Sequence, residues 1–221
     1  ITIADNGSTD GTLDVAKRLS ADDFSHVGYT HLDVRGRGLA LRKAWLESEA
    51  DVVSYVADNA PEYDLVVISD YGHGPVTSRV VQQARNSARF LAVNAQSNSA
   101  NLGYNMITKY AKADYVCIDA PEARMASGDR FGELGDIVQH RLSRSVESDR
   151  FVVTDGERGC VAFSSERGWS RVPAFTQQVV DTVGAGDAFL SITAPIAANG
   201  IDMDFVGLIG NAVGAMKVGT V

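Results

Sequence analysis

The sequence predicts an α/β protein in three layers, with helices on both faces of a mostly parallel β-sheet. Strand-like and helix-like segments alternate along almost the whole chain of 221 residues, which is the pattern of consecutive β-α-β units. Several strand-like segments, such as 64–70 and 115–120, are apolar almost without interruption. Strands of this kind are typical of a parallel sheet that is covered on both faces.

The N-terminal quarter, residues 1–57, predicts a β-α-β-α-β unit. Strand-like runs occupy 1–5, 27–33 and 51–56, and apolar residues at helical spacing occupy 13–19 and 39–48. The same alternation continues through residues 58–221. There we expect strands at 64–70, 89–96, 115–120, 151–156 and 159–165, and helices at 76–85, 129–146, 188–200 and 204–219.

Composition excludes some classes of function. The hydrophobic share of 45% and the charged share of 22% are ordinary for a globular domain. The formal net charge of -8 disfavours nucleic acid as a partner, because phosphate backbones attract basic surfaces. No run of about 18 apolar residues occurs, so we expect no membrane span. No signal peptide is visible either.

The two cysteines, Cys117 and Cys160, lie in apolar segments and match no metal-binding spacing. We interpret both as small buried hydrophobic residues, and we therefore expect a reducing, cytoplasmic compartment. The chain opens on a strand-like run without a methionine and stops inside a helix-like run. We expect a natural fusion with a deletion, an engineered chimera or a fragment.

The most informative segment is a glycine turn, Gly184-Ala-Gly186, which is followed at once by an apolar helix. Such a turn directs free backbone N–H groups at one point, and the helix dipole adds positive potential there. Asp187 lies beside this anion site, where a carboxylate could take the proton of an attacking hydroxyl. The pattern alone leaves open that Asp187 only stabilises the start of the helix.

The segment 181–189, DTVGAGDAF, resembles the signature of PfkB/ribokinase-family carbohydrate kinases. The resemblance implies a truncated ribokinase-like, Rossmann-like fold over residues 58–221, with ATP and Mg²⁺ as cofactors. It also implies a small-molecule sugar or sugar phosphate as substrate, and it leaves a homodimer open. In this family the turn forms the anion hole and the following aspartate is the base. These roles would fall on Gly184, Ala185, Gly186 and Asp187.

Other segments extend the resemblance. Thr154, Gly156 and Gly159 match the family's T-x-G-x-x-G turn, which contacts the nucleotide. Glu122 matches the N-x-x-E motif that helps to place magnesium, but Asp119 stands where asparagine is usual. Glu122 could also be a solvated acid at a helix start.

Two asparagines, Asn94 and Asn211, would lie on the nucleotide side by the same resemblance. The sequence allows equally that Asn94 forms a turn and that Asn211 is an ordinary helix residue. Asp70 opens the segment DYGHG, which resembles kinases of the heptose-kinase type. Because ligands gather at the carboxyl ends of parallel strands, we expect Asp70 to face the phosphate or sugar side. We interpret His73 as a turn histidine held by glycines.

The family's sugar-contacting G-G-x-x-x-N motif does not occur before residue 58. The sugar site is therefore expected to be missing or rebuilt, which puts the activity of this chain in doubt.

The N-terminal segment carries a second resemblance. Residues 5–12, DNGSTDGT, are similar to a strand and turn of family 2, GT-A type glycosyltransferases. Asp5 would then contact the nucleotide of a sugar donor, and Arg35 and Arg37 would meet its diphosphate. The alternative is a plain strand-turn-helix with Arg37 in solvent. A D-x-D motif is absent, with Asp58 as its only remnant.

Three functions follow from these patterns: a sugar kinase, a glycosyltransferase with a kinase-like scaffold, and a non-catalytic chimera. The domain prediction is a unit at 1–57 and a unit at 58–221, which could also merge into one sheet.

Overall fold

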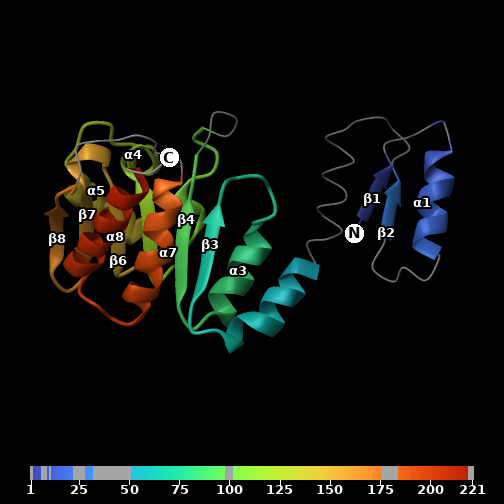
Figure 1. Ribbon diagram of the computed structural model, residues 1–221, viewed down its shortest axis with the longest axis horizontal. Coiled ribbons are helices and arrows are strands. Elements are labelled where there is room, and N and C mark those ends of the chain that lie inside the picture. The colour runs from blue at the N-terminus through green and yellow to red at the C-terminus, as the bar shows by residue number, and fades with distance from the viewer. Residues whose placement is uncertain are drawn as a thin grey trace. The chain divides into compact units, whose positions relative to one another are not determined.

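The computed structural model describes residues 2–5, 9, 11–21, 28–31, 51–97, 102–175 and 184–218. The chain divides into two compact units, Ile1–Tyr55 and Val56–Val221 (Figure 1).

The first unit contains a parallel pair of strands and a helix. Strand β1 (Thr2–Asp5) is followed by α1 (Thr12–Ala21) and by β2 (Gly28–His31), which pairs with β1. Both strands and the first helix were predicted. The second predicted helix, 39–48, lies outside the described residues.

The segment 51–56, predicted as a strand, is instead part of a helix over residues 51–59. Val53 and Val56 are half-buried and Ala60, in the short 3₁₀ turn that follows, is buried. These positions are spaced three and four apart, which is the period of one helix face and not of a strand. The predicted β-α-β-α-β unit is therefore wrong in its last strand.

The second unit is built on one six-stranded sheet. Its order is β3-β4-β5-β6-β7-β8. Strands β3 to β6 pair in parallel, and β7 pairs antiparallel with both β6 and β8. The strands are β3 (Val66–Asp70), β4 (Leu91–Ala95), β5 (Tyr115–Asp119), β6 (Arg150–Thr154), β7 (Cys160–Ser164) and β8 (Gly168–Val172). The prediction of a mostly parallel sheet is confirmed, although β8 was not predicted.

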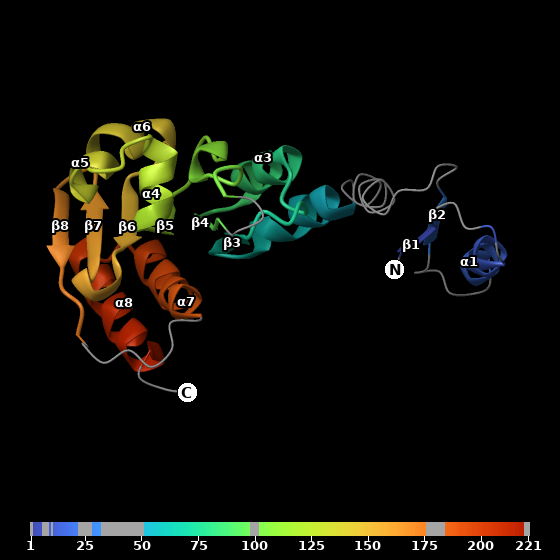
Figure 2. The same cartoon turned by 90° about the horizontal axis from the view of Figure 1, so that it is seen from above.

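Helices cover both faces of this sheet (Figure 2). One layer contains α3 (Ser78–Ser87), α4 (Ala120–Ser127), α5 (Leu134–Ile137) and α6 (Ser143–Ser145), and the other contains α7 (Ala185–Ala198) and α8 (Met203–Val218). Strand β5 shows how the sequence builds both interfaces. Its Val116 and Ile118 join the core under α4, while Tyr115 and Cys117 join the core under α7. The three-layer prediction is confirmed.

The long helix predicted over 129–146 begins only at Leu134 and includes a π-helical turn, Val138–Leu142. Asp129 explains the late start. Its Oδ1 accepts hydrogen bonds from the backbone N–H groups of Phe131 (3.2 Å) and Gly132 (2.8 Å). A side chain that binds nearby N–H groups in this way favours a turn over a helix.

Cys117 and Cys160 are both free and buried, as predicted. Burial raises the pKa of each thiol to about 12, so both remain protonated at neutral pH. Within the described ranges no helix combines the length and the apolar character that crossing a bilayer requires.

Candidate active site

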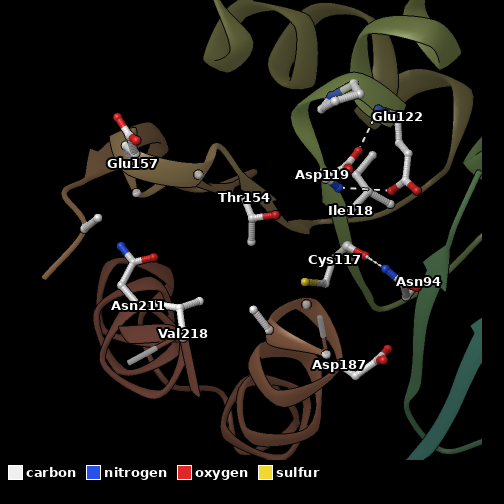
Figure 3. A pocket seen from close by; sticks show the side chains of 18 of the residues that line it. Asn94, Cys117, Ile118, Asp119, Glu122, Thr154, Glu157, Asp187, Asn211 and Val218 are labelled. Carbon is white, nitrogen blue, oxygen red and sulfur yellow. Dashed lines mark hydrogen bonds between the residues drawn. The ribbon is translucent and has the colours of Figure 1, made fainter. Parts of the chain in front are cut away.

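A pocket of about 620 Å³ opens at the carboxyl ends of β4, β5 and β6, against the first turn of α7 and the last turns of α8 (Figure 3). Apart from Asp70, its walls include every residue that the sequence assigned to the kinase-like site. These are Asn94, Asp119, Glu122, Thr154, Gly156, Gly159, Gly184, Ala185, Gly186, Asp187 and Asn211. Residues as far apart in the chain as Asn94 and Val218 therefore share one cavity.

The first wall is the start of helix α7. Gly184 has a φ of 76°, in the left-handed region that only glycine adopts easily. The glycine provides no side chain to cap the helix, and the first N–H groups of a helix have no partner within it. The turn therefore presents positive backbone dipoles to the pocket.

Asp187 lies in this first turn and is exposed. Its Oδ1 accepts two hydrogen bonds, from Oη of Tyr71 at 2.8 Å and from Nε2 of Gln96 at 3.2 Å. Although a hydrogen bond with Ser69 acts in the opposite direction, the bond to Asp187 and partial burial raise the pKa of Tyr71. The sequence did not predict these contacts, because Tyr71 and Gln96 lie 116 and 91 positions from Asp187 in the chain.

The second wall is the start of helix α4, where two carboxylates cap the helix. The Asp119 side chain accepts from the N–H of Glu122 at 2.8 Å, and the Glu122 side chain accepts from the N–H of Asp119 at 3.1 Å. Glu122 also accepts from the N–H of Ser97 at 2.9 Å. Glu122 is thus both a helix-start acid and a pocket residue.

The electrostatics of this wall are unusual. Burial raises the pKa of Asp119, and burial together with the charge of Asp119 raises the pKa of Glu122 to about 7. Two partly desolvated carboxylates side by side favour the approach of a proton or a cation.

Asn94 adds a third oxygen to the pocket. Its Nδ2 donates to the carbonyl of Cys117 at 2.8 Å, whereas its buried Oδ1 has no hydrogen-bond partner among the described residues. Those residues contain no cluster of three or more acidic, histidine or cysteine side chains. Mg²⁺ commonly takes only one or two protein carboxylates and completes its shell with phosphate and water. Asp119 and Glu122 therefore suit a magnesium ion that binds together with a nucleotide.

The third wall is the turn between β6 and β7. A Cβ atom on Gly159 would lie 2.0 Å from the carbonyl oxygen of Val172, so only glycine fits there. Asp155 accepts hydrogen bonds from Arg158 (2.7 Å) and Arg171 (3.1 Å). Although burial opposes it, these two cations lower the pKa of Asp155. The ion pairs hold the turn in place, and the sequence pattern did not reveal them.

Asn211 lines the pocket from α8 and also has a structural task. Its Nδ2 donates to the carbonyls of Val172 and Pro173, both at 3.0 Å. The side chain therefore joins α8 to the end of β8.

Asp70 does not face the pocket, and the prediction that it faces a ligand is wrong. Its side chain is buried, pairs with Lys109, and accepts from Oη of Tyr110 at 2.8 Å and from the N–H of Gly72 at 2.9 Å. Although burial has the opposite effect, these donors lower the pKa of Asp70. Donors within the protein therefore already bind the Asp70 carboxylate. His73 stacks on Tyr71, with ring centroids 6.2 Å apart.

The predicted site of the N-terminal segment is described only in part. Asp5 ends β1, opposite His31 of β2, and its side chain lies outside the described residues. Arg35 and Arg37 lie outside them altogether. The glycosyltransferase-like roles of these three residues stay predictions.

Comparison with known proteins identifies one family. The family described as pfkB family carbohydrate kinase matches residues 32–221. The match begins inside the predicted N-terminal unit, so it includes the positions of Arg35 and Arg37. The boundary proposed at residue 57 stays a prediction.

Curated relatives carry the name bifunctional protein HldE. The protein from Citrifermentans bemidjiense is 27% identical over 174 residues, which cover 78% of this chain and 35% of the relative. The protein from Nitrobacter winogradskyi is 29% identical over 205 residues, which cover 91% of this chain and 40% of the relative. The chain thus spans well under half the length of these relatives.

Solved structures agree on the fold. A mutant of phosphofructokinase-2 from Escherichia coli superposes with a TM-score of 0.61 at 18% identity, covering 79% of this chain and 55% of that one. Arabidopsis thaliana ribokinase, in complex with ribose and ATP, superposes with a TM-score of 0.59 at 16% identity, covering 77% and 53%. The second unit therefore has the ribokinase-like fold.

Proposed function

The chain belongs to the pfkB family of carbohydrate kinases, and we propose that its pocket binds ATP and transfers the terminal phosphoryl group to a sugar hydroxyl. One observation carries the proposal. A single cavity joins a helix start that no described side chain caps, an exposed carboxylate in that helix and a pair of acids on the facing wall. These are the parts that phosphoryl transfer needs.

The uncapped start of α7 is the proposed site of the transferring phosphoryl group. Negative charge on its oxygens would meet the backbone N–H groups of the turn Gly184–Gly186, and fixed dipoles of this kind stabilise charge that develops during a reaction. The ribokinase complex with ribose and ATP supports ATP and a sugar as the ligand classes.

Asp187 is the proposed base. Both of its hydrogen bonds from described residues end on Oδ1, so Oδ2 is the oxygen that would take the proton of the sugar hydroxyl. The hydroxyl oxygen then forms a bond to the terminal phosphorus while the bond from phosphorus to the bridging oxygen breaks. ADP leaves with that bonding pair, and the proton stays on Asp187.

Glu122 and Asp119 are the proposed magnesium side of the pocket. A bound Mg²⁺ would neutralise part of the triphosphate charge. The two carboxylates would hold the metal on the wall opposite Asp187 (Figure 3), while the terminal phosphoryl group reaches the start of α7.

The acceptor is proposed as a sugar or a sugar phosphate. The segment 70–74 resembles kinases of the heptose-kinase type, and the curated relatives named HldE share up to 29% identity with the chain. Heptose phosphates are therefore the first acceptors to test, followed by fructose phosphates and ribose.

The test is a phosphotransfer assay with radiolabelled ATP, Mg²⁺ and this panel of acceptors, on the wild type and on Asp187→Asn. The substitution keeps the size of the side chain but removes the base, so we expect the rate to fall by roughly 10²- to 10⁴-fold. ATP affinity, measured by calorimetry, should change little.

Asp149→Asn is the matched control, because Asp149 is exposed and remote from the pocket lining. It should leave both the rate and ATP affinity unchanged. Sugar phosphorylation that persists in Asp187→Asn would refute the role of Asp187. A wild type that labels no acceptor and binds no ATP would refute the proposed function.

A further inference from the structure

Two donors reach Asp187 from neighbouring strands of the sheet. Asp70, the last residue of β3, is paired in register with Ala95, the last residue of β4. Tyr71 and Gln96 are therefore the first residues beyond the two paired strand ends, and they lie next to each other. Both of their side chains donate to the same oxygen, Oδ1 of Asp187.

We infer that Tyr71 and Gln96 are positioning residues, which hold the Asp187 carboxylate in the orientation that proton transfer needs. The inference rests on the proposed role of Asp187 as the base. An exposed aspartate on the first turn of a helix can otherwise turn between rotamers. Two donors that converge on Oδ1 fix the plane of the carboxylate and leave Oδ2 for the substrate.

The backbone below the two donors is held by a buried network. The N–H of Gln96 donates to the carbonyl of Asp70 at 2.8 Å. The side chain of the buried Asn105 donates to the same carbonyl at 2.9 Å and to the carbonyl of Gln96 at 3.1 Å. Gln96 and Asp70, the residue directly before Tyr71, are thus tied to one anchor.

The buried Asp70, which ends β3, belongs to the same network as Asn105. The Asp70 carboxylate pairs with Lys109 and Tyr110, and Lys109 donates to Oδ1 of Asn105 at 2.8 Å. Asp70, Asn105, Lys109 and Tyr110 do not line the pocket, whereas Gln96 does. The physical effect of this network is to make two surface donors rigid, and functional groups keep a productive geometry when their supports are rigid.

A positioning role has a different kinetic signature from a binding role. Misplacement of a reacting group by about 1 Å can cost roughly 10²-fold in rate, because the near-attack geometry is lost. Neither Tyr71 nor the amide of Gln96 needs to touch ATP for this effect. The loss should therefore fall on kcat and not on the KM for ATP.

The experiment compares Tyr71→Phe, Gln96→Met and the double variant with the wild type of the full chain. Both substitutions keep the volume of the side chain and remove the donor. We expect kcat to fall roughly tenfold in each single variant and roughly a hundredfold in the double variant. The KM for ATP and the melting temperature should stay near their wild-type values.

Tyr63→Phe and Gln82→Met are the matched controls. Tyr63 is an exposed tyrosine before β3, and Gln82 is on helix α3, where it bonds only to Asn86 among the contacts described. Both controls should keep the wild-type kcat. Unchanged kcat in the double variant, or a loss that lies wholly in KM, would overturn the positioning role.

A second measurement separates this inference from the proposed function. If the wild type transfers no phosphate, the proposed function fails, and crystal structures of the wild type and the double variant decide the inference. We expect one Asp187 rotamer in the wild type and a displaced or split carboxylate in the double variant. An identical carboxylate in both structures overturns the inference.

Discussion

The starts of helices α4 and α7 face the same pocket, and they differ in their capping. Helix α4 begins with a capping box, in which Asp119 and Glu122 satisfy each other's backbone N–H groups. Helix α7 begins after Gly184, and no side chain of the described residues caps it. Both helices direct the positive end of their dipole toward the cavity. The cap therefore decides whether each wall attracts a cation or an anion.

The difference shows how one fold can bind both halves of a metal–nucleotide complex. Carboxylates that cap α4 more than offset its dipole, and their burial leaves a demand for positive charge. The glycine turn of α7 leaves its amides open to a phosphate. Charge is thus separated across a single cavity by two short sequence motifs.

The larger expected effect comes from removing one of the two carboxylates, Asp119 and Glu122, at the start of α4. Glu122→Gln removes a charge but keeps the cap, because glutamine also serves in a capping box. We expect Mg²⁺ affinity, in the presence of an ATP analogue, to weaken roughly 10- to 100-fold. Calorimetric titration with Mg²⁺ measures it, and Glu166→Gln, on the hairpin between β7 and β8, is the control.

The same variant tests the sign of a pH dependence. Since burial raises the pKa of Glu122 to about 7, the group is largely protonated at more acidic pH, and metal binding must displace that proton. Wild-type affinity for Mg²⁺ should therefore increase as pH rises through about 7. Glu122→Gln should lose most of this dependence. Equal pH profiles for the two proteins would remove Glu122 from the metal site.

A smaller effect is expected from Gly184→Ala, which adds a side chain at the start of α7. Alanine at Gly184 must adopt a left-handed conformation, which costs roughly 1–2 kcal/mol, or the turn must rearrange. We expect a loss of stability of about 1 kcal/mol and about tenfold weaker ATP binding. Urea unfolding and calorimetry measure the two quantities.

Gly200→Ala provides a matched comparison. Gly200 has a φ of 73°, close to the 76° of Gly184, and its Cβ would meet no atom within 4 Å. It lies outside the pocket lining. Gly200→Ala should lose similar stability and keep ATP binding. Equal binding losses in both variants would mean that the glycine acts on the fold and not on the phosphate.

The sequence predicted the fold best where apolar segments are long and clearly bounded. The apolar runs of β3, β4 and β5 and the long helices α7 and α8 were recognised in this way. The helix over 51–59 was mistaken for a strand, since five closely spaced apolar residues suit both periods until the core is known. Helix α4 was anticipated only in the alternative that Glu122 lies at a helix start, because Pro121, which fits a first helical turn, also suits a loop.

The candidate site was predictable where it depends on local motifs. The turn at Gly184 and the pair Asp119 and Glu122 are continuous in sequence, and the structure brings them to one cavity. The contacts of Tyr71 and Gln96 with Asp187 were not predictable, because they depend on strand register and on the packing of α7. Asp70 was misjudged for the same reason, as its partners Lys109 and Tyr110 come from a distant segment.

The most direct measurement is a crystal structure of the full chain with Mg²⁺ and a non-hydrolysable ATP analogue. The account predicts terminal phosphate oxygens about 3 Å from the backbone nitrogens of residues 185–187, with the metal on the side of Asp119 and Glu122. A triphosphate bound elsewhere, or turned away from the start of α7, would contradict it.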